Sequence, residues 1–351
     1  QVEAIMEAQT KKLMCDLPAH NSVPAKYVLP FQNRPRDQEL LDDLSVALPV
    51  IDLQAAVGEG RPQVVRKIME AGKEFGFFQV INHGLGEDVI QGFREAAGQF
   101  FGLPEEEKLQ YYFDDQSKPF RVVSGHITSY NNTNDMRYWH DCLKIWCYPV
   151  DKLMHQWPSQ PEIFRESLAK YSTAVHELGR RLLRMIAEGL GFDDHDFFEG
   201  DLTGGDTPMN VFYYPPCPDP SLTMGVRPHC DRYILTVLSQ GGVGGLQAKY
   251  RGRWIRVQPI HNAFVINFGL QMEIVTNGLF ASVEYRVVTN MVKERMSVAA
   301  FIRPSTDSRI GPAPGVMNGP PKFRDFTWDE YTKAYEATLG NREAMLDFFK
   351  L

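Results

Sequence analysis

Several features that would place this chain in a special class are absent from its 351 residues. No run of about 18 apolar residues occurs, so the sequence predicts no membrane-spanning helix. The opening segment QVEAIMEAQTKKLM is mixed and polar without an apolar signal core, which gives no support for secretion. With 37 Lys and Arg against 44 Asp and Glu, and no basic block, nucleic acid is not an expected partner.

Cysteine is scarce, and no internal repeat or low-complexity segment is present. The cysteines are odd in number and form no C-x-x-C pair, so neither a disulfide framework nor a zinc ribbon is expected. A reducing compartment is the default for such a chain, and we expect a cytoplasmic monomer that acts on a small molecule. The cysteines are Cys15, Cys142, Cys147, Cys217 and Cys230.

What is present is the composition of an ordinary globular protein, with 43 % hydrophobic and 23 % charged residues. In the first half, apolar residues recur at helical spacing in 61–76, 87–104 and 167–191, which predicts helices there. Short runs of hydrophobic residues at 48–53 and 77–84 predict strands. The first half is therefore expected to be rich in helix.

The second half follows a different pattern, after residues 111–134 in which no regular pattern is evident. From Met209 to Pro304 short β-type runs follow one another with Gly, Pro and Asn between them, and EIVTNG at 273–278 is one of these runs. Many short strands with close turns are typical of an all-β sandwich or barrel rather than of βαβ units. The tail at 327–351 returns to a helical pattern. We therefore expect a β-core in the second half.

The sharpest local feature is the tetrapeptide PHCD, which contains His229 and Asp231. Residues two apart in a strand point to the same face, so this imidazole and this carboxylate can meet one cation. They would supply two-thirds of the 2-His-1-carboxylate triad of non-haem Fe(II) oxygenases. An H-x-D pair alone arises often by chance, so the interpretation depends on the surrounding sequence.

In that surrounding sequence the chain resembles the plant 2-oxoglutarate/Fe(II)-dependent dioxygenases, in the hyoscyamine 6-hydroxylase-like and flavonol synthase-like branch. The resemblance covers nearly the whole chain and is carried by VFYYPPCPDPSLTMGVRPHCDRYILTVLSQ, RWIRVQP, NGLFASVEYRVVTN, KERMSVAAF, LPVIDL, GFFQVINHG and WPSQPEIFRESLAKY. It implies a mainly β fold with α, a double-stranded β-helix (jelly-roll) core wrapped by N-terminal helices and a C-terminal helix. The implied divisions are a helix-rich N-terminal domain at 1–205, a Fe(II)/2-oxoglutarate domain at 206–305 and a helical extension over the pocket at 306–351.

The resemblance also implies the cofactors Fe(II) and 2-oxoglutarate and a role for each matching residue. His229 and Asp231 match the first two iron ligands. Arg295 and Ser297, in the pattern R-x-S, match the pair that holds the distal carboxylate of 2-oxoglutarate, and a guanidinium fork suits a carboxylate. Tyr214, which precedes PPC, matches a tyrosine whose hydroxyl reaches the same cosubstrate.

Two positions depart from the family pattern. The third iron ligand, a His in N-G-x-F-x-S-x-x-H-R-V, is replaced by Tyr285 in NGLFASVEYRVV. Neutral imidazole is a ready ligand at pH 7, whereas a phenol has a pKa near 10 and must lose its proton to coordinate well. Phe212 stands where the family usually has an Asn that hydrogen-bonds the cosubstrate. Both changes remove cofactor contacts, so we expect the binding of iron and 2-oxoglutarate to be weakened or lost.

Two kinds of function stay open on these residues. The first is the oxidation of a small plant specialised metabolite, by hydroxylation or a related reaction, with iron on His229, Asp231 and either water or Tyr285. In the second the pocket is repurposed, and Tyr285 is the catalytic acid or base of a metal-independent cyclisation or isomerisation. A protein that only binds its ligand is a variant of the second.

Aromatic residues are the candidates for the substrate pocket, and they suit a planar aromatic or alkaloid-like ligand. We expect no cluster of cationic residues that would mark an acidic or phosphorylated substrate. The candidates are Phe120, Tyr130, Tyr138, Phe212, Tyr233, Phe348 and Phe349.

Overall fold

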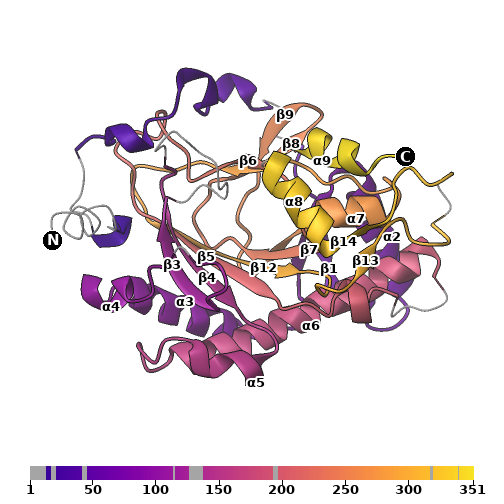
Figure 1. Cartoon of the computed structure of the whole chain (residues 1–351), viewed down its shortest axis with the longest axis horizontal. Coiled ribbons are helices and arrows are strands. Elements are labelled where there is room, and N and C mark those ends of the chain that lie inside the picture. Colours follow the sequence, from indigo (N-terminus) through magenta and orange to yellow (C-terminus); the bar gives the residue numbers. More distant parts are fainter. Residues whose placement is uncertain are drawn as a thin grey trace.

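The computed structural model describes residues 13–16, 21–41, 46–113, 115–125, 137–192, 197–316, 319–338 and 340–351. Two β-sheets form the centre, and helices cover the outer side of the larger sheet (Figure 1). The strands are β1 (Val50–Asp52), β2 (Phe77–Ile81), β3 (Phe120–Ser124), β4 (Asp141–Trp146), β5 (Pro208–Tyr214), β6 (Val226–His229), β7 (Leu235–Ser239), β8 (Leu246–Tyr250), β9 (Arg253–Arg256), β10 (Phe264–Phe268), β11 (Tyr285–Val287), β12 (Arg295–Ile302), β13 (Arg309–Ile310) and β14 (Phe326–Thr327).

Most of the helices come from the first 190 residues and from the last 24, and α7 lies among the strands of the second half. Within the described residues, none is long and apolar enough to cross a membrane. The α-helices are α2 (Arg61–Glu74), α3 (Glu87–Phe101), α4 (Glu105–Leu109), α5 (Val150–Leu153), α6 (Phe164–Leu190), α7 (Leu270–Val275), α8 (Trp328–Thr338) and α9 (Arg342–Phe349). Short 3₁₀ helices are η1 (Met14–Asp16), η2 (Ala25–Tyr27), η3 (Phe31–Asn33), η4 (Asp37–Glu39), η5 (Leu53–Ala56), η6 (Met154–Gln156) and η7 (Gly200–Leu202).

The larger sheet has the strand order β1-β2-β10-β7-β12-β5-β4-β3, and the smaller one has the order β6-β11-β8-β9. β1 and β2 pair in parallel, whereas β12 pairs antiparallel with both β5 and β7. Strands from before residue 205 therefore lie at both edges of one continuous sheet, with the strands from after that residue between them. Two facing sheets wrapped by helices are the architecture that the resemblance implied.

The long helices follow the hydrophobic spacing that predicted them. α2 begins with Pro62 in its first turn, where the missing N–H is not needed, and it buries Val64, Val65, Ile68 and Met69. α6 begins at residue 164, a few residues before the predicted start, since Phe164 joins the same buried stripe. It runs along the outer face of the larger sheet (Figure 1).

The prediction of a strand in EIVTNG was wrong, because this segment forms α7 and the turn after it. All six residues of α7 are buried, and a short apolar run has no periodicity that separates a helix from a strand. The carboxylate of Glu273 in α7 is 2.5 Å from a guanidinium nitrogen of Arg342 in α9. A second difference is β3, which lies in the stretch 111–134 where no pattern was evident.

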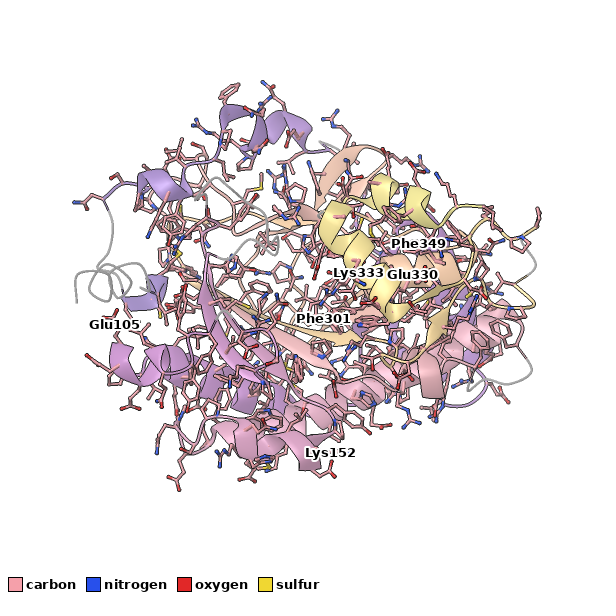
Figure 2. All side chains as sticks on the ribbon, in the orientation of Figure 1. Glu105, Lys152, Phe301, Glu330, Lys333 and Phe349 are labelled. Atoms are coloured by element: carbon pink, nitrogen blue, oxygen red, sulfur yellow. The ribbon has the colours of Figure 1, made fainter. Side chains whose placement is uncertain are left out.

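The alternation of side chains along the strands separates the core from a cavity between the sheets. Along β5, Met209 and Val211 are fully buried in the core shared with the helices, whereas Phe212 and Tyr214 line the cavity. β12 behaves in the same way, and its Phe301 lies near the centre of the molecule, while Lys152 lies at the outer edge (Figure 2). The larger sheet thus carries the core on one face and the candidate site on the other.

Candidate active site

The cavity between the two sheets has a volume of about 450 Å³, which is within the range of small-ligand pockets. The larger sheet supplies rows of residues two apart, the smaller sheet supplies β6 and β11, and α8 supplies Tyr335 and Glu336. The rows are Asn210, Phe212 and Tyr214 on β5, Arg295, Ser297, Ala299 and Phe301 on β12, Thr236 and Leu238 on β7, and Val265 and Asn267 on β10.

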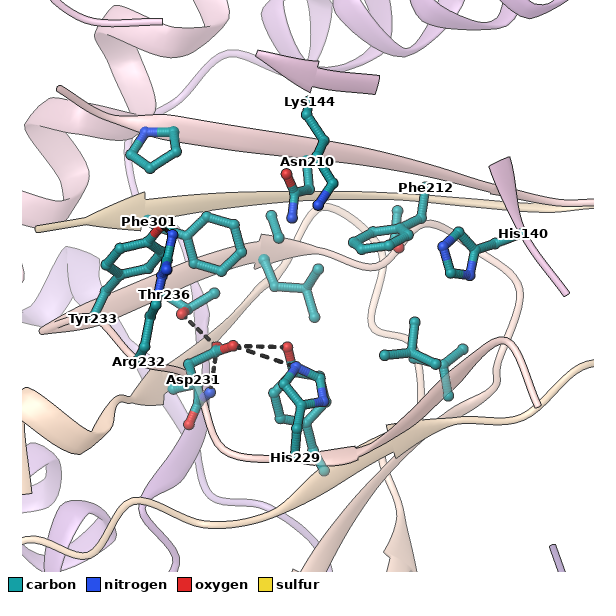
Figure 3. Close-up of a pocket in the computed structure, with 18 of the residues that line it drawn as sticks. His140, Lys144, Asn210, Phe212, His229, Asp231, Arg232, Tyr233, Thr236 and Phe301 are labelled. Carbon is teal, nitrogen blue, oxygen red and sulfur yellow. Dashed lines mark hydrogen bonds and ion pairs between the residues drawn. The ribbon is translucent and has the colours of Figure 1, made fainter. Parts of the chain in front are cut away.

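His229 and Asp231 meet at one wall of this cavity (Figure 3). The Nδ1–H of His229 donates to the carbonyl oxygen of Arg227 at 2.9 Å, which leaves Nε2 to face Asp231 Oδ1 at 3.6 Å. Oδ2 of Asp231 accepts hydrogen bonds from Thr236 Oγ1 at 2.6 Å and from Asn267 Nδ2 at 2.7 Å. These contacts fix the orientation of both side chains.

The charge of Asp231 follows from these neighbours. Burial raises the pKa of the Asp231 carboxyl, but His229 and the hydroxyls of Thr236 and Tyr285 outweigh it and hold the pKa below its ordinary value. The carboxylate is therefore ionised at neutral pH. A carboxylate and an imidazole nitrogen 3.6 Å apart can bind the same cation, since each would lie about 2 Å from it.

Tyr285 occupies the position beside this pair where the family has its third ligand. β11 pairs with β6 so that Tyr285 lies opposite His229, and the two ring centres are 4.4 Å apart. The hydroxyl of Tyr285 donates to Asp231 Oδ1 at 3.0 Å. Burial raises the pKa of this phenol well above its ordinary value, and the charge of Asp231 raises it further. The side chain is therefore a hydrogen-bond donor in this arrangement and not an anionic ligand.

The fit to iron is thus incomplete. Among the residues that the structure describes, no third His, Cys, Asp or Glu completes a metal-binding group. His229 and Asp231 are suitable donors, but the phenol of Tyr285 points its proton at one of the oxygens that a metal would use. Two of the three positions of the triad fit iron, and the third does not.

The opposite part of the cavity carries Arg295, which is 2 % exposed. Its Nη1 donates to Ser297 Oγ at 3.1 Å and its Nε to the carbonyl oxygen of Val243 at 3.2 Å. Its Nη2 is buried and has no hydrogen-bond partner among the described residues. A buried donor without an acceptor costs about 1–3 kcal/mol, and a ligand carboxylate would supply the acceptor.

Tyr214 lies against this guanidinium, with its ring centre 5.0 Å from Arg295 Cζ. Burial raises the pKa of Tyr214 to about 12, so its hydroxyl keeps its proton and can donate to an anion. The three residues Arg295, Ser297 and Tyr214 therefore fit the distal carboxylate of 2-oxoglutarate. Phe212 lies between Asn210 and Tyr214 on the same strand face, and its ring centre is 5.1 Å from that of His140. An apolar ring thus lies where the family usually has an amide.

Three of the substrate candidates, Tyr138, Phe212 and Tyr233, line the cavity. Tyr130 lies outside the described residues. Phe120, Phe348 and Phe349 are not among the cavity residues, so their assignment to the substrate pocket was wrong.

Phe120 alternates with Arg121 along β3, so it turns away from the cavity and packs against Phe100, with ring centres 5.5 Å apart. Phe349 is fully buried on α9, with its ring centre 4.1 Å from that of Phe326 (Figure 2). Its neighbour Phe348 is 56 % exposed. The sequence shows that these residues are aromatic, but their facing depends on strand register and helix docking.

The expectation that no cationic cluster marks the pocket was also wrong. Basic side chains from segments far apart in the chain line the cavity, namely Arg121 on β3, Lys144 on β4, Arg227 on β6 and Arg232 just after β6. Figure 3 shows Lys144 and Asn210 projecting from the larger sheet toward the cavity that also holds Asp231. The strand pairing that gathers them was not evident from residue spacing, since DCLKIW in β4 does not alternate between polar and apolar residues.

Comparison with known proteins identifies the family. Residues 205–304 match the 2OG-Fe(II) oxygenase superfamily, and residues 48–160 match the family described as non-haem dioxygenase in morphine synthesis N-terminal. The chain is 41 % identical over 328 residues to 2'-deoxymugineic-acid 2'-dioxygenase of Hordeum vulgare, which covers 92 % of this chain and 93 % of that protein. It is 35 % identical to hyoscyamine 6-dioxygenase of Hyoscyamus niger over 94 % of this chain and 96 % of that protein.

Among solved structures, JOX2 in complex with 2OG, Fe and JA matches with a TM-score of 0.83 at 28 % identity, covering 96 % of each chain. The chain belongs to the 2OG-Fe(II) oxygenase superfamily, whose cofactors are Fe(II) and 2-oxoglutarate. The resemblance to plant dioxygenases and the jelly-roll fold are confirmed.

Proposed function

We propose that this chain is a 2-oxoglutarate-dependent oxygenase that oxidises a small plant metabolite inside the cavity. The observation that carries the proposal is the buried, unpartnered Nη2 of Arg295, which lines the same cavity as His229 and Asp231. A buried guanidinium nitrogen left without an acceptor is costly to a protein that binds no anion there. The plant dioxygenases to which the chain is similar support the same function.

In this proposal each residue has a defined task. Arg295, Ser297 and Tyr214 hold and orient the distal carboxylate of 2-oxoglutarate through donated hydrogen bonds. His229 and Asp231 hold the metal, which supplies the oxygen chemistry that side chains lack. Thr236 and Asn267 keep Asp231 turned toward the cavity through their hydrogen bonds to Oδ2.

The release of succinate from 2-oxoglutarate tests the proposal. We expect the native chain, supplied with Fe(II), ascorbate and 2-oxoglutarate, to release succinate slowly, because one ligand is missing. Arg295→Leu is expected to abolish that release, whereas Arg256→Leu, at a surface position on β9, is expected to preserve it. Thermal unfolding of both variants separates a lost anchor from a lost fold. Native protein that releases no metal-dependent succinate would contradict the proposal.

A second candidate is a metal-independent reaction, and the hydrogen bond from Tyr285 to Asp231 favours it. In this case the phenol serves as a proton donor to the ligand, and the metal position is given up. This candidate predicts that the native chain releases no succinate and that the Tyr285→His variant does release succinate. Succinate release by the native chain, at a rate that Tyr285→Phe leaves unchanged, would reject this candidate.

A further inference from the structure

The cavity contains a lysine whose charge is not neutralised by any residue that the structure describes. Lys144 on β4 lies opposite Asn210 on β5, so both side chains leave the larger sheet on the cavity face (Figure 3). Within the part of the chain that the structure describes, the ammonium group of Lys144 has no hydrogen-bond or ion-pair partner. The group is available to a ligand that enters the cavity.

A second buried lysine shows what a structural role requires. Lys108 is 1 % exposed, and its ammonium group donates to the carbonyl oxygen of Phe101 at 2.7 Å and forms an ion pair with Asp16. A lysine buried for stability is thus supplied with acceptors by the fold. Lys144 lacks such acceptors and faces a cavity, which is the arrangement of a binding group.

The acidic residues that the structure describes around the cavity do not pair with Lys144. Asp231 is occupied, because its oxygens accept from Thr236, Asn267 and Tyr285. Glu336 on α8 also lines the cavity, but it is exposed to solvent and forms no ion pair with Lys144 among the described residues.

Two cations near Lys144 add to the positive charge around it instead of neutralising it. Burial, together with smaller contributions from the positive charges of Arg121 and Arg232, lowers the pKa of Lys144 to about 8. Arg232 is directed by Tyr233, whose hydroxyl accepts from Nη2 at 2.6 Å, and it also lines the cavity. Lys144 and Arg232 therefore place two positive charges on this side of the cavity, and an anion would relieve their repulsion.

We propose that the substrate is an acid whose carboxylate binds Lys144, with the side-chain amide of Asn210 and the guanidinium of Arg232 lining the same region. The inference rests on the proposed function in taking the Arg295 region as the place of 2-oxoglutarate. It replaces the expected alkaloid-like ligand, since a protonated amine would be repelled by these cations. The aromatic rings of Tyr233 and Phe301 would contact the apolar part of the acid.

Calorimetric titration of the metal-free protein tests this inference. The probes are phenylacetate, cinnamate, glutarate and citrate, each paired with its methyl ester, with 2-oxoglutarate present at saturation. A repeat in the Arg295→Leu background removes the other place where an acid can bind. We expect at least one acid to bind about tenfold more tightly than its ester, because the ester lacks the charge-assisted hydrogen bonds.

The matched variants are Lys144→Met, Lys144→Arg and Lys152→Met, the last at an exposed position on α5 (Figure 2). Lys144→Met is expected to abolish the preference for the acid, while Lys144→Arg and Lys152→Met preserve it. Acids and esters that bind equally, or a preference that survives Lys144→Met, would overturn the inference. The measurement involves neither metal nor turnover, so its failure is distinguishable from a failure to release succinate.

Discussion

The two ends of the cavity differ in how many hydrogen-bond partners the protein supplies to their charged groups. At the end that carries Arg295, a guanidinium nitrogen is buried without a hydrogen-bond acceptor among the described residues. At the end that carries Asp231, the carboxylate accepts hydrogen bonds from three neighbouring side chains. A group that lacks a partner marks where a ligand is expected, whereas a group with its full set marks where the protein has supplied the partner itself. The anion-binding end is therefore open to ligands, and the metal-binding end is partly closed by Tyr285.

The largest expected effect comes from a substitution that removes the phenol of Tyr285 from the metal-binding end. Tyr285→His removes the phenol from Asp231 and adds the third ligand of the family pattern. We expect the affinity for Fe(II) to rise at least about 100-fold, since even partners of metal ligands affect affinity by 10–100-fold. Tyr285→Phe is the control, because it removes the hydrogen bond to Asp231 without adding a ligand. Equal iron affinity of the His and Phe variants would show that the phenol only obstructs the metal position.

A substitution that keeps the positive charge at position 295 tests the anion-binding end of the cavity. Arg295→Lys preserves one positive charge but loses the planar fork that can contact a carboxylate, Ser297 and Val243 together. We expect the dissociation constant for 2-oxoglutarate to rise about 30-fold in a fluorescence titration. An unchanged constant would place the cosubstrate carboxylate elsewhere.

The pH dependence of acid binding gives an effect of intermediate size. Lys144 has a lowered pKa of about 8, so its charge is present below that pH and is lost as the pH rises through it. The affinity for an acid is therefore expected to fall by up to about tenfold per pH unit above 8. Arg121 and Arg232 stay charged in this range, and burial raises the pKa of the Cys142 thiol to about 12, so none of the three titrates there. Lys144→Arg should flatten the profile, and a profile that still falls in that variant would assign the effect to another group.

The smallest effect is expected at Phe212, between the two ends. Phe212→Asn restores the amide of the family pattern beside Tyr214, and we expect the affinity for 2-oxoglutarate to rise about threefold. The measurement is the same fluorescence titration. Phe212→Leu, which removes the ring without adding an amide, is the control. A similar gain in both variants would indicate that the ring merely crowds the cosubstrate.

The sequence predicted the parts of this site that lie within one motif. His229 and Asp231 are two residues apart, and the pairing of Arg295 with Ser297 follows the same rule of alternation. The unusual Tyr285 was also evident, because the residues around it keep the family pattern. The hydrogen bond that ties it to Asp231 was not predicted, since it depends on the pairing of β11 with β6.

The substrate side could not be predicted in the same way. Lys144 and Asn210 come together through the pairing of β4 with β5, and Arg232 joins them from a loop. Phe120 and Arg121 are neighbours in sequence but face opposite sides of β3. The sequence prediction placed Phe120 in the cavity, whereas Phe120 lies in the core and Arg121 lines the cavity. Register and docking, and not residue type, decide which side chains meet a substrate.

Helix α8 holds the loop that carries Asp231 through hydrogen bonds to its backbone. The hydroxyl of Tyr335 donates to the carbonyl oxygen of Cys230, and that of Tyr331 donates to the carbonyl oxygen of Arg232, so α8 clamps the backbone on both sides of the carboxylate. During synthesis on the ribosome, this clamp closes only after residues about 100 positions downstream have emerged. The part of the cavity that contains His229 and Asp231 is therefore expected to be among the last parts of the nascent protein to fold.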